Sequence, residues 1–154
     1  MGEPLHHSDS IVVARPADEL YGLVSDVTRM GEWSPVCKAC WWDEGDGPRV
    51  GAHFTGRNEL PERTWETNSE VVAADPGKEF AWVVTMTGTR WGFEFESVDG
   101  GTRLTESWDF PEQAVAFFEE HLGDDAPAQM ENRHELARTG IAATLAAIKQ
   151  TAES

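Results

Sequence analysis

The chain has 154 residues, of which 40% are hydrophobic and 26% are charged, so its length suits one well-formed core over residues 1–154 and is too short for two ordinary domains. Twelve lysines and arginines stand against 28 aspartates and glutamates, and the resulting net charge of -16 repels nucleic acid and anionic membrane surfaces. No stretch approaches the roughly 18 apolar residues of a membrane span and no secretion signal precedes the first run, so we expect a cytoplasmic protein without stable membrane association.

The N-terminal part predicts one strand followed by two short helices. Residues 10–14 form a short apolar run rich in β-branched side chains, and Pro16 suits the first position of a helix. Apolar residues then recur at helical spacing over residues 20–27. Residues 26–35 contain Gly31 and end in Ser-Pro, so we expect a second short helix that breaks at the proline.

From Lys38 onward the hydrophobic period changes to two, and turn residues at 45–48, 60–62, 75–77, 87–88 and 99–101 separate six alternating runs. Such a pattern predicts an antiparallel meander with one buried face and one wet face. The residues predicted to face inward are Val50, Ala52, Phe54, Gly56 and Asn58; Trp65, Thr67, Ser69 and Val71; Phe80, Trp82, Val84 and Met86; Trp91, Phe93 and Phe95; and Leu104, Glu106, Trp108 and Phe110.

The C-terminal part predicts helices. Residues 112–122 suit a brief helix, residues 123–127 an acidic loop, and residues 128–152 a helix of roughly 35 Å. An apolar stripe marks one face of this last helix, formed by Met130, His134, Ala137, Ile141, Leu145 and Ile148. One helix laid across a curved sheet leaves space beneath it, so we expect a cavity lined by the tryptophans of the strands.

The order of elements resembles the START/Bet v1-like helix-grip superfamily (SRPBCC), in particular its polyketide cyclase/dehydrase and lipid-transport-like branch. The segments SIVVARPADELYGLVSDVTRMGEWSP at 10–35 and GGTRLTESWDF at 100–110, with the closing helix, carry the resemblance. It implies an α+β fold in which a curved seven-stranded antiparallel sheet wraps around a long C-terminal helix, with two short helices between strands 1 and 2. Proteins of this kind hold an apolar or amphipathic molecule between the sheet and the last helix.

The side chains predicted to line the cavity are aromatic, with a few polar anchors among them. They are Phe54, Asn58, Trp65, Ser69, Trp82, Trp91, Phe93, Glu106, Trp108 and His134. The alternative interpretation is a filled core, since large rings pack well beneath a helix. The inward polar residues favour a pocket, because an unpartnered polar group in a dry core costs about 1–3 kcal/mol.

Glu106 and His134 are the candidate catalytic residues. Glu106 stands in mid-strand between Leu104 and Trp108, where desolvation favours the protonated acid, which donates a hydrogen bond or exchanges a proton. The alternatives for Glu106 are an ion pair or a bulge that turns the side chain outward. His134 lies on the apolar stripe of the last helix, where a structural role competes with a role in ligand binding.

The remaining metal- and thiol-bearing residues give no strong motif. Cys37 and Cys40 form a CxxC that leads into a strand and has no second ligand pair, so free thiols are predicted rather than a redox or zinc site. His6 and His7 fall in what we expect to be a loose N-terminal tail, and His53 and His121 are expected on the surface. The sequence suggests neither a metal nor another cofactor.

Three functions follow as hypotheses. The first is binding of a small hydrophobic or amphipathic ligand (a lipid, polyketide or aromatic metabolite) by a monomer or homodimer. The second, implied by the resemblance, is a polyketide aromatase/cyclase, although Val71 stands where those cyclases have a cavity arginine. The third is an interaction module, which predicts an exposed apolar patch near Met30 and Trp33.

Overall fold

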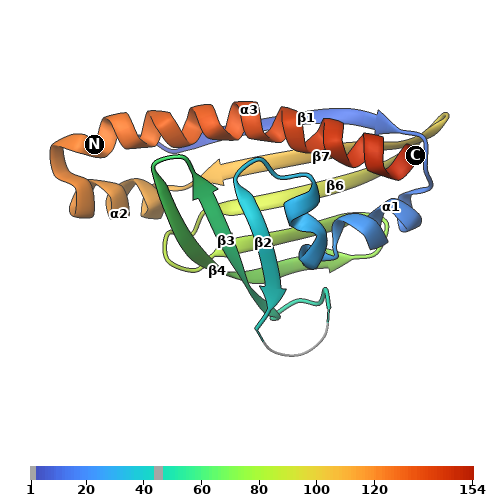
Figure 1. Cartoon of the computed structure of the whole chain (residues 1–154), viewed down its shortest axis with the longest axis horizontal. Coiled ribbons are helices and arrows are strands. Elements are labelled where there is room, and N and C mark those ends of the chain that lie inside the picture. Colours follow the sequence, from blue (N-terminus) through green and yellow to red (C-terminus); the bar gives the residue numbers. More distant parts are fainter. Residues whose placement is uncertain (1–2, 44–46) are drawn as a thin grey trace.

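The computed structural model describes residues 3–43 and 47–154 and has the helix-grip architecture expected for this chain (Figure 1). The strands form one antiparallel sheet in the order β1-β7-β6-β5-β4-β3-β2. Between β1 (Leu5–Val13) and β2 lie the helix α1 (Ala17–Val24) and the 3-10 helix η1 (Val27–Glu32). The two short helices between the first and second strands are therefore confirmed.

The meander follows the alternating runs of the sequence. Its strands are β2 (Cys37–Trp42), β3 (His53–Leu60), β4 (Arg63–Asp75), β5 (Glu79–Val84), β6 (Arg90–Val98) and β7 (Gly101–Phe110). The turn predicted at 45–48 lies partly outside the described residues. The first position of β7 needs glycine, because Gly101 has a φ of 150° and a Cβ there would lie 2.0 Å from the carbonyl oxygen of Val13.

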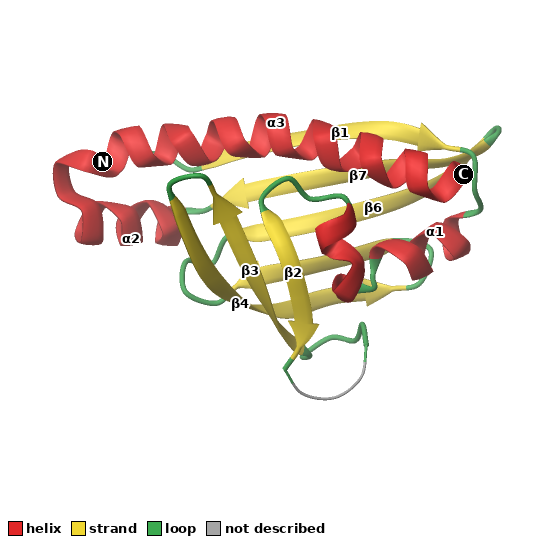
Figure 2. Cartoon of the chain, in the orientation of Figure 1, coloured by secondary structure: helices red, strands yellow, loops and turns green. Residues whose placement is uncertain are grey.

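The sheet is strongly curved, and helices close one side of it. In Figure 2 strands β2, β3 and β4 stand steeply across the direction of β6 and β7, while the last helix runs along β1 and β7. After β7 the chain forms α2 (Glu112–Leu122), the 3-10 helix η2 (Gly123–Asp125) and α3 (Ala126–Glu153). The acidic loop predicted at 123–127 is mostly helical, because η2 leads directly into α3.

Helix α3 packs its predicted apolar stripe against the sheet. Met130, Ala137, Ile141, Leu145 and Ile148 are all buried. The C-terminal end of the helix is held to the first strand by polar contacts as well. The Nζ of Lys149 donates to the carbonyl oxygen of Val12 at 2.8 Å, and the Ala14 N–H donates to the Glu153 carboxylate at 2.8 Å.

The N-terminal segment is a strand and not the expected tail. β1 begins at Leu5 and pairs with β7 from Leu5 opposite Phe110 to Val13 opposite Thr102. His6 Nδ1 lies 2.6 Å from an Asp109 carboxylate oxygen, and His7 is directly opposite Trp108. The prediction was wrong because this polar stretch has little strand propensity of its own. It becomes a strand by pairing with the edge of β7.

Two residues predicted to face inward are exposed. Val50 is 64% exposed and Met86 is 67% exposed, because both lie in connections outside the strands and the alternation does not extend to them. In β4 the pairing register shifts between Val71 and Ala73. The extra residue, Val72, is 39% exposed, as expected of a β-bulge.

Candidate ligand-binding site

Three of the four predicted tryptophans form one row across the inner face of the sheet. Trp82 of β5 pairs with Trp91 of β6, and Trp91 pairs with Trp108 of β7. The row continues to Val71 of β4 on one side and to His7 of β1 on the other. Directly opposed side chains share a face in an antiparallel sheet, so the inward orientation of these indoles follows from the register.

The aromatic rings of the inner face contact one another. Trp82 is buried, and its ring centroid lies 5.6 Å from that of Phe54 and 6.1 Å from that of Phe93. Trp91 is half-buried, with its ring 6.4 Å from that of Trp108. These side chains therefore occupy much of the space where the sequence predicts a cavity.

Glu106 lies in the next row of the same face and is buried. It sits opposite Phe93 of β6 and Asp9 of β1, and only 5% of its surface is exposed. Its Oε1 atom is buried without any hydrogen-bond partner, and no ion pair to it is formed within the described part of the chain. Burial raises the pKa of Glu106 well above its ordinary value, because desolvation favours the neutral acid over the carboxylate. Neither the ion pair nor the outward bulge considered for this residue is present.

Tyr21 brings a second polar atom into the interior, at a position that the sequence pattern did not single out. Its ring projects from α1 onto Phe80 at 6.3 Å and Phe95 at 5.5 Å. Its hydroxyl oxygen is buried without a hydrogen-bond partner. Burial, and secondarily the charge of Asp75, raise the pKa of Tyr21, so the hydroxyl keeps its proton. The available signal was a tyrosine, the only one in the chain, on the apolar stripe of the first helix.

His134 stacks on the tryptophan row from the helix side. Its ring centroid lies 5.6 Å from that of Trp108, with an interplanar angle of 23°. No hydrogen bond or ion pair joins it to Glu106 among the residues described, so the two candidate catalytic groups are not a bonded pair in this structure.

The other predicted anchors lie toward β3 and β4. Ser69 is buried, and Asn58 is half-buried with its amide nitrogen 3.3 Å from Thr67 Oγ1. Trp65 pairs with Asn58 on β3 and so lies well away from the row of the other three tryptophans. Its ring is flanked by two arginines, Arg63 at 4.1 Å and Arg133 at 5.1 Å. Trp65 is therefore not part of the row formed by Trp82, Trp91 and Trp108.

The two cysteines are free thiols, as predicted. Their sulfur atoms are 3.0 Å apart, although residues three apart in a regular strand face opposite ways. A register shift between Cys37 and Ala39 turns both to one side. The hydrogen bond from Cys40 lowers the pKa of Cys37 and, together with burial, raises the pKa of Cys40.

We expect this thiol pair to be protected by the fold. Both cysteines are buried, so Ellman's reagent should titrate two thiols per chain in denaturant and react at least about 100-fold more slowly with the folded protein. A titration that finds no thiol after unfolding would show a disulfide instead.

The apolar patch required by an interaction module is not formed at the predicted place. Trp33 is 4% exposed, and Met30 packs its sulfur 3.7 Å from Cys40 Sγ.

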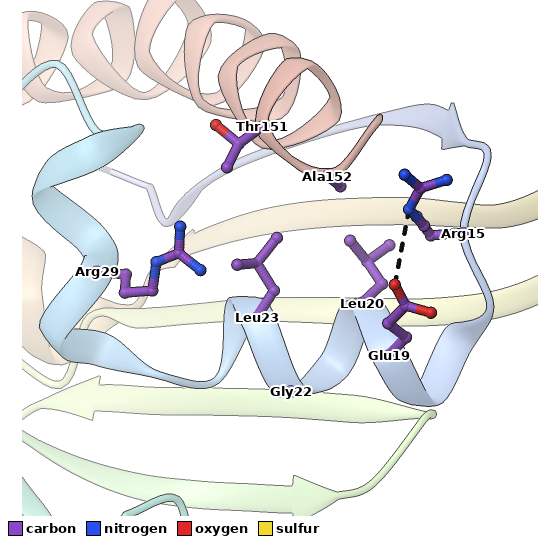
Figure 3. Close-up of a pocket in the computed structure, with 8 residues that line it drawn as sticks. All are labelled: Arg15, Glu19, Leu20, Gly22, Leu23, Arg29, Thr151 and Ala152. Atoms are coloured by element: carbon purple, nitrogen blue, oxygen red, sulfur yellow. Dashed lines mark ion pairs between the residues drawn. The ribbon is translucent and has the colours of Figure 1, made fainter. Parts of the chain in front are cut away.

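Two surface pockets lie elsewhere. One, of about 400 Å³, opens between α1 and the last turn of α3 (Figure 3). Leu20 and Leu23 project into it from α1, Thr151 and Ala152 come from α3, and Arg15 pairs with Glu19 at its edge at 3.6 Å. The other, of about 340 Å³, is lined by residues including Arg49, His53 and Asn68. Neither contains a predicted ligand-binding residue.

Further features bear on metals and membranes. Over residues 3–43 and 47–154, no three His, Cys, Asp or Glu side chains gather as metal ligands. None of the helices described is both long and apolar enough to cross a bilayer.

Comparison with known proteins places these features in context. Residues 4–153 match the model of a family described as polyketide cyclase/dehydrase and lipid transport. The solution structure of a polyketide-cyclase-like protein from Corynebacterium glutamicum is 51% identical, with a TM-score of 0.73 over 98% of this chain and 93% of that one. Among functionally curated proteins, no sequence matches this chain.

Two more distant structures share the fold. The aromatase/cyclase ZhuI from Streptomyces sp. R1128 is 19% identical, with a TM-score of 0.71 over 98% of this chain and 94% of that one. The di-domain aromatase/cyclase BexL of the BE-7585A biosynthetic pathway is also 19% identical, with a TM-score of 0.76 over 98% of this chain and 50% of that one.

Proposed function

Because the chain belongs to the polyketide cyclase/dehydrase and lipid transport family, we propose that it binds a small hydrophobic or amphipathic molecule between the inner face of the sheet and α3. The observation that carries this proposal is the pair of buried polar atoms without partners, Glu106 Oε1 and the Tyr21 hydroxyl. Both belong to the apolar interior, and leaving a polar group unpartnered there costs about 1–3 kcal/mol. A ligand that supplies the missing partners recovers this cost.

The two groups lie around the same aromatic residues. Phe80 contacts the Tyr21 ring and pairs with Phe93, and Phe93 pairs with Glu106. The neutral carboxylic acid and the phenol both offer O–H donors, so the ligand fitted to them carries a carbonyl or hydroxyl oxygen within an apolar frame. Ketone-bearing aromatic and polyketide-like molecules have this character.

Binding requires the rings to move. The aromatic side chains contact one another across the site, so a ligand must part them, and the half-buried Trp91 is the member of the row with most freedom to turn. In this role the chain would be a soluble cytoplasmic carrier or sensor of a small metabolite.

The test follows tryptophan emission while fatty acids, aromatic ketones and steroids are added. We expect a binding member of this panel to shift or quench the emission in a saturable way, because Trp82, Trp91 and Trp108 lie in one row of the inner face. Replacing the exposed Trp41 by phenylalanine is the control and should leave the response unchanged. Native mass spectrometry of freshly purified protein would identify a ligand carried through purification, and absence of any response across the panel would contradict the proposal.

The second candidate function is that of an aromatase/cyclase, and the observation that favours it is the neutral acid at Glu106 beside the aromatic row. Such a group protonates a developing enolate or alkoxide during an aldol condensation. His134 would then act separately, from the opposite side of the row. Replacing Glu106 by glutamine separates the two functions, because a cyclase loses turnover while still binding whereas a carrier changes only in affinity.

A further inference from the structure

Two arginines share one tryptophan at the end of the site nearest α2. The guanidinium of Arg63, at the start of β4, lies 4.1 Å from the ring centroid of Trp65, and that of Arg133, on α3, lies 5.1 Å from it. Arg133 is also 5.8 Å from the ring of Phe118 on α2. Two elements far apart in sequence, β4 and α3, thus bring two positive charges to one indole.

Neither guanidinium is neutralised. Arg63 and Arg133 have no hydrogen-bond or ion-pair partner within residues 3–43 and 47–154. This is unexpected in a chain with 28 acidic and 12 basic residues. Six other arginines each pair with a glutamate, namely Arg15, Arg29, Arg57, Arg90, Arg103 and Arg138.

The pair is also electrostatically costly. Burial, and secondarily the charge of Arg63, lower the pKa of Arg133. Arg133 is half-buried and Arg63 is exposed, and contact with the indole face offsets only part of the cost of desolvating the Arg133 guanidinium. An anion that reaches both guanidinium groups would offset the repulsion between them and form charge-assisted hydrogen bonds with both.

We propose that Arg63 and Arg133 bind the carboxylate or phosphate head group of an amphipathic ligand, with Trp65 as the surface that holds both guanidinium groups in place. The proposal rests on the function proposed above for the apolar part of the ligand. Arg133 contacts Phe118, Phe118 lies 5.1 Å from Phe110, and Phe110 lies 5.4 Å from Trp108. A head group at the arginines therefore has a continuous aromatic path to the tryptophan row.

The test compares two fluorescent probes with the same aromatic frame. N-phenyl-1-naphthylamine is neutral, and 8-anilinonaphthalene-1-sulfonate adds one anionic group. We expect the folded protein to bind the sulfonate about tenfold more tightly, which corresponds to about 1.4 kcal/mol. Arg133→Met and Arg63→Met should each reduce this preference to about threefold or less while leaving the affinity for the neutral probe within about twofold.

Arg103→Met is the matched control, because Arg103 is exposed and paired with Glu96. It should keep the full preference for the anion. A second measurement needs no variant: increasing salt should weaken binding of the sulfonate and not of the neutral probe. Displacement of the sulfonate by decanoate or by decyl phosphate, with decanol for comparison, shows whether a carboxylate or a phosphate fits better.

The outcomes separate the two proposals. Binding of both probes with equal affinity to the wild type overturns the head-group site and leaves the apolar site standing. Binding of the sulfonate alone, lost in both arginine variants, supports the head-group site and contradicts the apolar one. Absence of binding by either probe overturns both.

Discussion

Replacing Glu106 by leucine is expected to raise the free energy of unfolding by about 1–3 kcal/mol at pH 7. The substitution exchanges a buried carboxyl group that has an unpartnered oxygen for an apolar side chain of similar size. Urea denaturation followed by circular dichroism measures the change. The same variant should bind ligands with a carbonyl group more weakly, because its O–H donor is gone. If the variant is more stable but binds more weakly, Glu106 is retained for function and not for stability.

The pH dependence gives a second measure of the same residue. The unfolded chain releases the Glu106 proton above about pH 4.3, whereas burial keeps the proton in place in the folded protein. Folding therefore binds a proton in this range, and the contribution of Glu106 to stability falls as the pH rises from the unfolded pKa toward the raised folded pKa. Glu106→Gln should remove this fall.

The exposed Glu94 on the neighbouring strand is the control, and Glu94→Gln should leave the pH profile as it is in the wild type. A Glu106→Leu variant less stable than the wild type at pH 7 would mean that the carboxyl group has a partner in solution.

Replacing Trp82 by alanine is expected to cost about 3–5 kcal/mol of stability, a large share of the 5–15 kcal/mol typical of a domain. Trp82 is 6% exposed and contacts the rings of Phe54, Phe80 and Phe93, so its removal leaves a cavity that rigid neighbours cannot close. Chemical denaturation measures the loss of unfolding free energy, with the same dependence on denaturant concentration used to fit the variant and the wild type.

Trp65→Ala is the informative comparison. Trp65 is half-buried and its ring contacts are with two arginines, so we expect a cost of about 1 kcal/mol. Trp41→Ala, at a 41% exposed position, should change stability by less than about 0.5 kcal/mol. Equal costs at positions 65 and 82 would show that the tryptophans form one cluster in solution and not a row with an outlier.

Alternation along each strand was sufficient to predict most of the inner face. The inward positions of Trp82, Trp91, Trp108 and Glu106 follow from a period of two, and the apolar stripe of α3 follows from a period of 3.6. These periodic patterns depend only on residues that are close together in the sequence. The environment of Glu106 was predictable for the same reason, since Leu104 and Trp108 flank it on its own strand.

Structural features that depend on residues far apart in the sequence could not be predicted from such local patterns. The strand at Leu5–Val13 exists because β7 offers an edge, and the bulge at Val72 appears only in the pairing with β5. The alternation along β4 predicts the correct face of the sheet for Trp65. Only the pairing register of the strands shows that Trp65 lies apart from the other three indoles. Arg63 and Arg133 come together at Trp65 only because the tertiary fold brings the side chain of Arg133 on α3 to β4, and no local period predicts that contact.

The pairing of β1 with β7 also sets the order in which a newly made chain completes its structure. Val13 pairs with Thr102, so the first strand leaves the ribosome long before its partner. The meander must wait for α3, the last element made, before its tryptophan-bearing surface is covered. Pairings of such long sequence separation slow folding, and an uncovered aromatic face attracts other chains meanwhile. The acidic charge of the nascent protein, through mutual repulsion, is then a safeguard during synthesis.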